Sequence, residues 1–345
     1  MYSKINYYNF VLMQVLRKLL FPISLVYGLI VFLRNRCYDL GIFSSKSFNT
    51  KTICVGNLSV GGTGKTPMIE LLIKSLHQDY QLAILSRGYK RKSNGFLLSN
   101  NKTSVEDLGD EPYQLKSKFP KVAVAVDANR RNGIAQLELR VNLDVILLDD
   151  AFQHRKVMPG YSILLTDYHN IYVNDWYIPT GDLRDSKKEA RRANTIVVTK
   201  CPKDLSISEK KEIIDKINPK KHQKVLFSFL SYNKDLKGAN VNLDELKNKK
   251  VTLVTGIANP VPLENFLLEE GIAFDHMKFN DHHFFTEQEI TVFKGKECIL
   301  TTEKDYVRLK SRLSNLHYIE VSHQFIKQDK EILDEELRQF MTTGS

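Results

Sequence analysis

The sequence predicts an α/β fold in which helices cover both faces of a mostly parallel sheet. Two observations favour this fold. Short runs of Val, Ile and Leu recur with helical stretches between them, which is typical of parallel strands buried on both faces. Polar clusters follow these strands directly, at the sheet edge where open α/β folds bind their ligands. The expected strands are Thr52–Val55, Leu82–Leu85, Val122–Val126, Val145–Leu148, Ile163–Leu165, Thr195–Val198, Val251–Val254 and Cys298–Leu300.

Composition and charge limit the class of protein. The chain has 345 residues, of which 42% are hydrophobic, so it can build one large or two medium domains and is not a disordered chain. A net charge of +10 indicates an anionic partner, which is either nucleic acid, a membrane surface or a phosphorylated substrate. The cysteines lie far apart without a Cys-x-x-Cys pair, which argues against a disulfide framework or a zinc site and favours a reducing cytosolic compartment. They are Cys37, Cys54, Cys201 and Cys298.

The N-terminal region contains an uncharged apolar run at residues 19–33. A membrane-spanning helix needs about 20 apolar residues, and this run is shorter and interrupted by Pro22 and Gly28. It does not end in the small-x-small pattern of a secretory signal. We therefore expect residues 1–35 to include a helix that lies in the membrane interface, with a buried core helix as the alternative. The flanking basic residues, which would meet anionic lipid headgroups, are Arg17, Lys18, Arg34 and Arg36.

The segment Gly56–Pro67 has the composition and the context of a phosphate-binding loop, because it lies between a β-branched run and an apolar pattern of helical spacing. Glycines let backbone N–H groups wrap phosphate oxygens, and the helix N-terminus adds partial positive charge. We expect Lys65 to reach the β- and γ-phosphates and the Thr66 hydroxyl to ligate Mg²⁺. The usual motif has glycine where this chain has Ser59, and an ordinary glycine-rich turn is the alternative. The candidate nucleotide-binding residues are Ser59, Val60, Gly61, Gly62, Thr63, Gly64, Lys65 and Thr66.

A second element of a nucleotide site is the apolar stretch Leu143–Asp150, which ends in two carboxylates. An acid at this position helps to hold Mg²⁺ beside a phosphate loop. Strands also end in Asp for turn reasons, but the combination with the loop favours metal-binding roles for Asp149 and Asp150. GTPases read guanine with Asn-Lys-x-Asp after a strand, whereas this chain has Thr199-Lys-Cys-Pro202, so ATP is the expected nucleotide.

Three further polar clusters have more than one interpretation. Asp110 precedes Pro112 and is favoured as a helix N-cap, although it has the chemistry to accept a proton from an attacking hydroxyl. The Asn280–Phe284 segment fits a surface turn, a weak metal site, or a histidine that tunes a carboxylate. The basic run 186–192 fits a solvated helix face or a phosphate contact.

The C-terminal part of the chain differs from the alternating pattern that precedes it. Lys224–Asn242 contains two possible strands around a polar turn without a helix, which suggests a β-ribbon between two lobes. The tail from Lys327 is charged and is expected to be helical, with a frayed end at Thr342–Ser345.

Taken together, these motifs resemble the tetraacyldisaccharide 4′-kinase family, the lipid A 4′-kinases of Gram-negative bacteria. The hydrophobic N-terminus followed by a basic segment also matches, so the resemblance covers most of the chain. The matching stretches occur in the family's order between residues 55 and 305, and they are VGNLSVGGTGKTP, LSRGYKRK, GDEP, VDANR, LLDDAFQH, IPTGDLRD, GIANP, DHHFF and TEKD.

The resemblance implies a fold and an activity. The fold is a P-loop core with a mostly parallel sheet and a smaller α/β lobe joined by a β-ribbon, divided as 1–35, 36–224 and 225–345. The activity is transfer of phosphate from ATP, with Mg²⁺, to the 4′-hydroxyl of a tetraacyl glucosamine disaccharide 1-phosphate, giving lipid IVA. The implied partners are this lipid and the membrane surface, at the cytoplasmic face of a Gram-negative inner membrane. No nucleic acid is expected and no obligate protein partner is inferred. The alternatives are a P-loop kinase with a soluble acceptor and a membrane-associated P-loop ATPase switch.

The resemblance also implies roles for individual residues. Asp110 corresponds to the family's proposed base and His282 to its imidazole partner, with Lys65 as the third catalytic residue. The metal-associated residues correspond to Thr66, Asp149 and Asp150, and Arg184 is a candidate phosphate contact. Asp185 departs from the family's pattern, because many relatives carry Glu there. Its role stays open, together with those of His154, His283 and Lys304.

Overall fold

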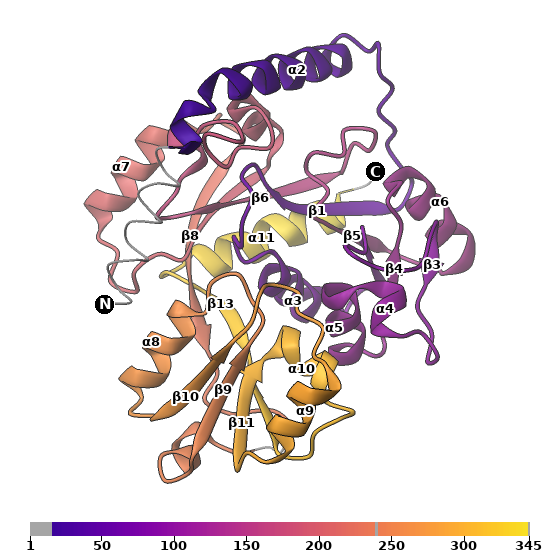
Figure 1. Cartoon of the computed structure of the whole chain (residues 1–345). Coiled ribbons are helices and arrows are strands. Elements are labelled where there is room, and N and C mark those ends of the chain that lie inside the picture. Colours follow the sequence, from indigo (N-terminus) through magenta and orange to yellow (C-terminus); the bar gives the residue numbers. More distant parts are fainter. Residues whose placement is uncertain (1–15, 239–240, 344–345) are drawn as a thin grey trace.

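The larger lobe is built on a nine-stranded sheet with helices on both faces (Figure 1). The computed structural model describes residues 16–238 and 241–343. The strand order is β13-β8-β7-β6-β1-β5-β2-β4-β3, and neighbours run parallel except at the two edges, where β13 and β3 are antiparallel. The strands are β1 Lys51–Asn57, β2 Leu82–Ser86, β3 Leu97–Leu98, β4 Ala123–Val126, β5 Val145–Asp149, β6 Tyr161–Asp167, β7 Thr195–Thr199, β8 Lys224–Tyr232 and β13 Val321–Phe325.

Each face of this sheet has its own hydrophobic core. Ile53 and Val55 of β1 pack on one side, while Cys54 between them packs on the other, as the two-residue period of a strand requires. The first face carries α3 Lys65–Leu76, α5 Asp110–Lys118 and α11 Asp329–Thr342, and the second carries α6 Arg130–Arg140 and α7 Ile207–Ile217. Shorter helices are α4 Val105–Leu108, η1 Tyr172–Asn174 and η2 Lys187–Arg192.

The smaller lobe repeats this layered architecture. Its four strands are all parallel, in the order β10-β9-β11-β12. Helix α8 packs on one face of this sheet, and α9 and α10 pack on the other. The elements are η3 Leu243–Leu246, β9 Val251–Thr255, α8 Val261–Glu269, β10 Phe274–Lys278, α9 Glu287–Lys294, β11 Cys298–Thr302, α10 Glu303–Leu309 and β12 Leu316–Ile319.

The predicted α/β fold is confirmed. All eight expected strands are present, each within two residues of its expected ends. The sequence reasoning missed β3, β10, β12 and β13, and each of these is an edge strand of its sheet. An edge strand is covered less completely than a central strand, so it does not need the continuous apolar run by which the central strands were recognised.

The ribbon between the lobes is formed differently from the expected local pair. Only its first strand, β8, lies within Lys224–Asn242, and its antiparallel partner is β13, which follows the smaller lobe in the chain. Helix α11 then packs on the larger sheet through Leu333, Leu337 and Met341. We therefore propose that the smaller lobe spans about residues 233–320 and that residues 321–342, expected to belong to it, are part of the larger lobe.

Helix α2 (Phe21–Asp39) lies on the larger lobe at the end opposite the smaller lobe (Figure 1). It packs closely, because a Cβ atom at Gly28 would lie 2.7 Å from the ring of Tyr177. The side-chain amide of Asn35 donates to the carboxylate of Asp185 over 2.7 Å. The face that α2 turns toward the protein is thus mostly small or polar, and its buried residues are Ser24, Gly28, Val31 and Asn35.

Most of the large apolar side chains of α2 point away from the protein, which excludes the alternative of a buried core helix. The large apolar residues of α2 with more than half of their surface exposed are Ile23, Leu25, Val26, Leu29, Ile30, Phe32 and Leu33. Residues 1–15 of the expected N-terminal segment lie outside the described residues. Within the described part of the chain, every helix falls short of the length and apolar character needed to cross a membrane.

A buried cluster of charges joins the two lobes. The ammonium group of Lys118 on α5 lies 2.7 Å from Glu70 on α3, 3.0 Å from Glu303 on α10 and 2.7 Å from Glu320. Burial, together with the negative charge of Glu70, raises the pKa of Glu303 to about 7. Three carboxylates therefore share one cation, and only the ammonium group of Lys118 offsets their mutual repulsion within this cluster.

Replacing Lys118 with Met should leave the three carboxylates without their cation. Removing one partner of a buried ion pair costs about 3–5 kcal/mol. We therefore expect the free energy of unfolding of Lys118→Met to be lower than that of the parent by about this amount at pH 8. A carboxyl whose pKa is raised on folding takes up a proton as the chain folds, so its contribution to stability falls as the pH rises through that pKa. The free energy of unfolding that Lys118→Met loses relative to the parent, measured by urea denaturation, should therefore be smaller at pH 6 than at pH 8.

The matched control is Lys92→Met, which breaks an exposed pair with Glu106. Its stability should stay within about 0.5 kcal/mol of the parent at both pH values. If Lys118→Met loses the same free energy of unfolding at both pH values, the three carboxylates do not depend on Lys118 as their common cation.

Candidate active site

The phosphate loop connects the end of β1 to the start of α3. Gly61 and Gly64 have backbone φ angles of +116° and +85°, a conformation that L side chains rarely adopt, so the turn requires glycine at both positions. The side-chain amide of Asn57 donates to the hydroxyl of Thr63 over 3.1 Å and holds the loop closed. Because α3 begins at Lys65, its unpaired first-turn N–H groups and its positive dipole end border the loop.

The first half of the loop is tied to the segment 175–183. The hydroxyl of Ser59 donates to the Asp175 carboxylate over 2.8 Å, and the backbone N–H of Val60 donates to the Asp182 carbonyl over 2.7 Å. Ser59, expected among the nucleotide-binding residues, is buried and uses its hydroxyl as a brace. The tip of the loop is open, since nothing lies within 4 Å of a Cβ atom built at Gly62.

A buried histidine supports the loop from β13. His323 is 3% exposed, with Nε2 2.8 Å from the Gly64 carbonyl and Nδ1 3.0 Å from the Ser228 hydroxyl. Burial lowers the pKa of His323 to about 4, so its ring is neutral near pH 7. A carbonyl oxygen only accepts, so Nε2 carries the proton and donates to Gly64 while Nδ1 accepts from Ser228. This bond fixes the peptide plane immediately before Lys65.

The two carboxylates at the end of β5 have different environments. Asp149 is 3% exposed, and its Oδ2 accepts from the Ser86 hydroxyl over 3.0 Å. Burial raises the pKa of Asp149 to about 7, and the negative charges of Glu111 and Asp150 add to this effect. The influence of Glu111 indicates that the first turn of α5 lies close to the carboxyl end of β5.

Asp150 is held as an anion. Its backbone has a left-handed φ of +45°. Its Oδ1 accepts from Arg184 over 2.9 Å and lies 3.7 Å from the Lys65 ammonium. Lys65 and Arg184 lower the pKa of Asp150 despite its burial. Arg184 also donates to the side chain of Asn57, which links it to the phosphate loop.

An oxygen suited to a metal ion is present at Asp149. Its Oδ1 is buried and has no hydrogen-bond partner among the described residues. Mg²⁺ is usually held by one or two carboxylates together with substrate phosphates and water, and a carboxylate oxygen without a donor fits that role. No three His, Cys, Asp or Glu side chains in residues 16–238 and 241–343 form a ready-made metal cage. Asp150 would have to give up part of its pairing with Arg184 to ligate a metal.

Asp110 does not cap a helix with its side chain, contrary to the interpretation that the residues alone favoured. Gly109 is the N-cap residue of α5, and Asp110 is the first residue of the helix. The Asp110 carboxylate, 6% exposed, instead lies 2.7 Å from Nδ1 of His282 and accepts from the guanidinium of Arg308. These interactions lower the pKa of Asp110 although burial alone would raise it. The structure therefore brings the Asp110–His282 pair together across the two lobes.

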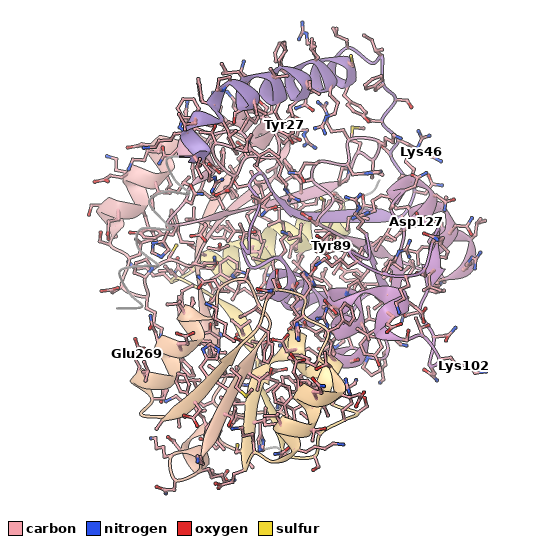
Figure 2. The ribbon with its side chains drawn as sticks, in the orientation of Figure 1. Tyr27, Lys46, Tyr89, Lys102, Asp127 and Glu269 are labelled. Atoms are coloured by element: carbon pink, nitrogen blue, oxygen red, sulfur yellow. The ribbon has the colours of Figure 1, made fainter. Side chains whose placement is uncertain are left out.

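His282 has contacts on both ring nitrogens. Its Nε2 lies 3.2 Å from the Lys304 ammonium, which also pairs with Asp281 over 2.7 Å. An ammonium only donates, so Nε2 accepts and Nδ1 carries the proton that is donated to Asp110. The ring of Tyr89 meets the imidazole edge-on at a centroid distance of 5.4 Å. Tyr89 is labelled in Figure 2, in the middle of the molecule between the larger and smaller lobes.

A cavity of about 190 Å³ lies between the first turn of α3 and the smaller lobe. Thr66 and Glu111 border it from the larger lobe and Lys304 from the smaller lobe. Its apolar wall includes Tyr232, Ile257 and Leu263. Thr66, expected to bind nucleotide and metal, thus faces an open space.

Several other predicted residues have structural partners. Asp185 is fully buried and binds Arg34 and Asn35 of α2, so it anchors that helix. His283 pairs with Glu289 over 2.9 Å and does not take part in the contact with Asp110. Within the basic run 186–192, Arg191 pairs with Asp39, and Arg192 pairs with Glu189 and donates to the Phe152 carbonyl.

Sequence reasoning missed Arg308 and His323, and it noted Ser86 only as part of the LSRGYKRK stretch, without a role of its own. Arg308 and His323 lie on short elements whose local patterns carry no sign of a site, and their contacts join residues 198 and 259 positions apart in the chain. Ser86 ends β2 and so had the signal that marked other residues, a polar side chain at the carboxyl end of a parallel strand.

Comparison with known proteins gives a consistent result. The family model for tetraacyldisaccharide-1-P 4′-kinase matches residues 16–342. The chain is 48% identical over 322 residues to the tetraacyldisaccharide 4′-kinase of Flavobacterium johnsoniae, covering 91% of this chain and 94% of the relative. It is 44% identical over 317 residues to the protein of the same name from Bacteroides thetaiotaomicron, covering 85% and 83% of the two chains.

A solved structure is similar over nearly the whole length of the chain. It is the LpxK protein of Aquifex aeolicus, described as a complex with ATP. The two structures superpose with a TM-score of 0.77 at 32% sequence identity, covering 94% of this chain and 99% of the other.

Replacing His323 with Leu should weaken ATP binding. The variant removes one of the two donors to the Gly64 carbonyl, which keeps the Met68 N–H at 3.1 Å, and it leaves the buried Ser228 hydroxyl without its partner. An unpaired buried group costs about 1–3 kcal/mol. If half of this cost, about 1 kcal/mol, falls on the ATP-bound state alone, ATP affinity falls about fivefold, since 1.4 kcal/mol is a factor of ten. Isothermal titration with ATP measures the change. The control is His323→Gln, whose amide keeps a donor near the same position and should bind ATP within about threefold of the parent. Equal affinity for parent and Leu variant would contradict a role in ordering the loop.

Proposed function

This chain belongs to the tetraacyldisaccharide-1-P 4′-kinase family, and on that premise we propose that it phosphorylates the 4′-hydroxyl of a tetraacyl glucosamine disaccharide 1-phosphate with ATP. The product is lipid IVA, an intermediate of lipid A biosynthesis. The observation that carries the proposal is the Asp110–His282 pair, whose carboxylate belongs to the first residue of α5, a helix on the same face of the sheet as α3.

The phosphate loop has the parts that hold a triphosphate. The backbone N–H groups around Gly62 and Gly64 and the first turn of α3 would bind the phosphate oxygens. The Lys65 ammonium, now 3.7 Å from Asp150, is placed to neutralise charge on the transferring group. Arg184 would contact phosphate from the opposite side once its pairing with Asp150 loosens. The cavity beside Thr66 has an apolar wall that suits the base of ATP.

Mg²⁺ is the expected second cofactor. Asp149, with its unpaired Oδ1, and the Thr66 hydroxyl would hold it, and Asp150 would lie next to them. When bound, the ion supplies charge that neutralises the phosphate oxygens. The Ser86 hydroxyl orients the Asp149 carboxylate by occupying its other oxygen.

Asp110 is the proposed base. Its pKa is lowered by His282 and Arg308, so the carboxylate is ionised at neutral pH and ready to accept the proton of the sugar hydroxyl. The weak basicity that follows suits this reaction, because phosphoryl transfer depends more on positioning and charge than on a strong base. His282 donates its Nδ1 proton to Asp110 and thereby fixes the orientation of the carboxylate.

The exposed apolar face of α2 supports a position at the membrane surface. An acceptor with several acyl chains costs about 0.8 kcal/mol for each CH₂ group that is withdrawn from the bilayer, so an enzyme that meets the headgroup in place avoids this cost. The net charge of +10 favours an anionic surface. We propose that the protein lies at the cytoplasmic face of the inner membrane as a peripheral or monotopic protein, since ATP is supplied from that side.

The direct test is incubation with labelled ATP and a disaccharide 1-phosphate lipid, followed by analysis for a product with a second phosphate. A kinase for a soluble acceptor would leave the lipid unlabelled, and an ATPase switch would release inorganic phosphate without it. Lys65→Ala is the matched control, and its turnover should fall at least about a hundredfold because charge stabilisation carries most of this catalysis.

Polar substitutions on α2 should reduce membrane binding without unfolding the protein. We expect the triple variant Leu25→Gln, Leu29→Gln, Phe32→Gln to sediment with anionic liposomes much less than the parent, because these side chains are each more than half exposed and contribute apolar area to the surface. The control carries Leu139→Gln, Ile207→Gln and Leu268→Gln, which are at least as exposed but lie elsewhere. If both triple variants lose liposome binding equally, α2 is not the anchor.

Asp110→Asn and His282→Ala should act on the same step. The amide keeps the shape of the carboxylate but accepts no proton, and removal of the imidazole takes away one of the two side chains that orient the carboxylate. Residues that act as a unit give non-additive losses, so the double variant should be little slower than Asp110→Asn alone while ATP binding persists in both single variants. Fully multiplicative losses in turnover would show that the two residues act independently.

A further inference from the structure

Arg308 makes a two-point contact with the proposed base. It projects from α10 of the smaller lobe, and its Nε donates to Oδ1 of Asp110 over 2.8 Å while its Nη2 donates to Oδ2. The side chains of Arg308 and Asp110 are only 5% and 7% exposed. A fork of this kind fixes the plane of a carboxylate as well as its charge, which a lysine does not do.

The same guanidinium also holds the loop that carries the imidazole partner. Its Nη1 donates to the His283 carbonyl, and its plane lies 4.5 Å from the ring centre of Phe284. His282 has a left-handed backbone φ of +64°, a conformation that a non-glycine residue keeps only when its surroundings enforce it. Arg308 therefore binds Asp110 directly and also contacts the two residues that follow His282 in the chain.

The hydrogen bonds leave one place on Asp110 for a further donor. Oδ2 accepts from both Arg308 and His282, which uses its two lone pairs. Oδ1 accepts from Arg308 alone among the residues that the structure describes, so one of its lone pairs remains available. The arrangement thus selects Oδ1 as the atom that meets the acceptor hydroxyl.

We propose that Arg308 is a positioning residue of the phosphoryl transfer, which orients Asp110 so that Oδ1 takes the proton of the acceptor hydroxyl. This inference rests on the proposed role of Asp110 as the base. In the reaction, the acceptor O–H proton passes to Oδ1 as the new O–P bond forms and the bond between the γ-phosphate and ADP breaks. Arg308 exchanges no proton and touches neither substrate.

The charge of Arg308 gives the role a measurable signature. The ionisable groups that face Asp110 are Arg308 and His282 from the smaller lobe, with Lys304 and Asp281 behind the imidazole and Glu111 next along α5. A cation beside a carboxylate lowers its pKa by about 1–3 units. Without Arg308, burial of Asp110 is opposed by His282 alone, so the pKa of Asp110 rises from its lowered value.

The test compares Arg308→Met, which removes fork and charge, with Arg308→Lys, which keeps the charge. In Arg308→Met, kcat/KM for the lipid should fall at least about a hundredfold at pH 7. The acidic limb of its pH–rate profile, where kcat/KM falls as the pH is lowered, should lie at least about one pH unit higher than in the parent. In Arg308→Lys the limb should stay within about half a unit of the parent while kcat/KM falls about tenfold, because the charge remains and the fork is lost. KM for ATP should change less than about threefold in both.

The matched control is Arg312→Met. Arg312 lies just beyond the same helix and binds the Phe285 carbonyl and the exposed Glu287, away from Asp110. Its rate and its pH–rate profile, the acidic limb included, should match those of the parent. An acidic limb in Arg308→Met that coincides with the parent's, or an equal rate loss in Arg312→Met, overturns the proposal. Thermal unfolding shows whether Arg308→Met folds. If it does not, Arg308→Lys tests the proposal instead, and a lower kcat/KM with an unmoved acidic limb supports it. Parental kcat/KM in Arg308→Lys overturns the proposal.

Asp110→Asn in the same assay separates this inference from the proposed function. If Asp110→Asn retains parental turnover, Asp110 is not the base and both proposals fail together. If Asp110→Asn is inactive while Arg308→Met keeps the parental rate and pH profile, the base assignment stands and only the role of Arg308 is rejected.

Discussion

A carboxylate that stays ionised when it is withdrawn from water must be paired, and this constraint determines how the parts of the molecule are joined. Asp185 is fully buried where α2 meets the larger lobe, and Asp110 is nearly so where the two lobes meet. Removing one partner of a buried ion pair costs about 3–5 kcal/mol. Each of these two interfaces is therefore stabilised only when residues on both of its sides are in contact. Lys118, with its three carboxylates, adds a second such contact between the lobes. The proposed base is therefore part of an interface that holds the fold together.

Two adjacent residues connect α2 to the phosphate loop. Arg184 reaches Asp150 and Asn57 beside the phosphate loop, whereas Asp185 binds Arg34 and Asn35 of α2. The hydroxyl of Tyr27 on α2 donates to the Arg184 carbonyl over 2.9 Å (Figure 2). The two neighbouring side chains reach different partners, so one short segment serves both contacts. The exposed apolar face of α2 is thus held at a fixed position relative to the phosphate loop, as a reaction on a lipid headgroup requires.

The sequence predicted those features that depend on local pattern. Central strands have continuous apolar runs, and the phosphate loop has glycines at its turns, so both were recognisable before the structure. The roles of Asp110 and the ribbon depend on distant partners. A helix-start position predicted a cap for Asp110, but His282, 172 residues away, and Arg308 take its carboxylate instead. The strand β8 was visible, but nothing local indicated that β13 would pair with it. For α2, the apolar run predicted a helix near a membrane, yet only the contacts of Gly28 and Asn35 show which face the protein covers.

The geometry also decides which member of the Asp110–His282 pair is the better proton acceptor. Both nitrogens of His282 are engaged, Nδ1 as a donor to Asp110 and Nε2 as an acceptor from Lys304. For the imidazole to take the sugar proton, Nε2 would have to leave Lys304, and the resulting imidazolium would lie next to an ammonium group. Asp110 needs no such rearrangement, because its Oδ1 has a single donor and its negative charge is already balanced by Arg308. Protonation of Asp110 would leave the buried guanidinium of Arg308 without an anion, so the protonated form of Asp110 is unfavourable and readily loses its proton again. The base is therefore returned to its ionised form by the same ion pair that orients it.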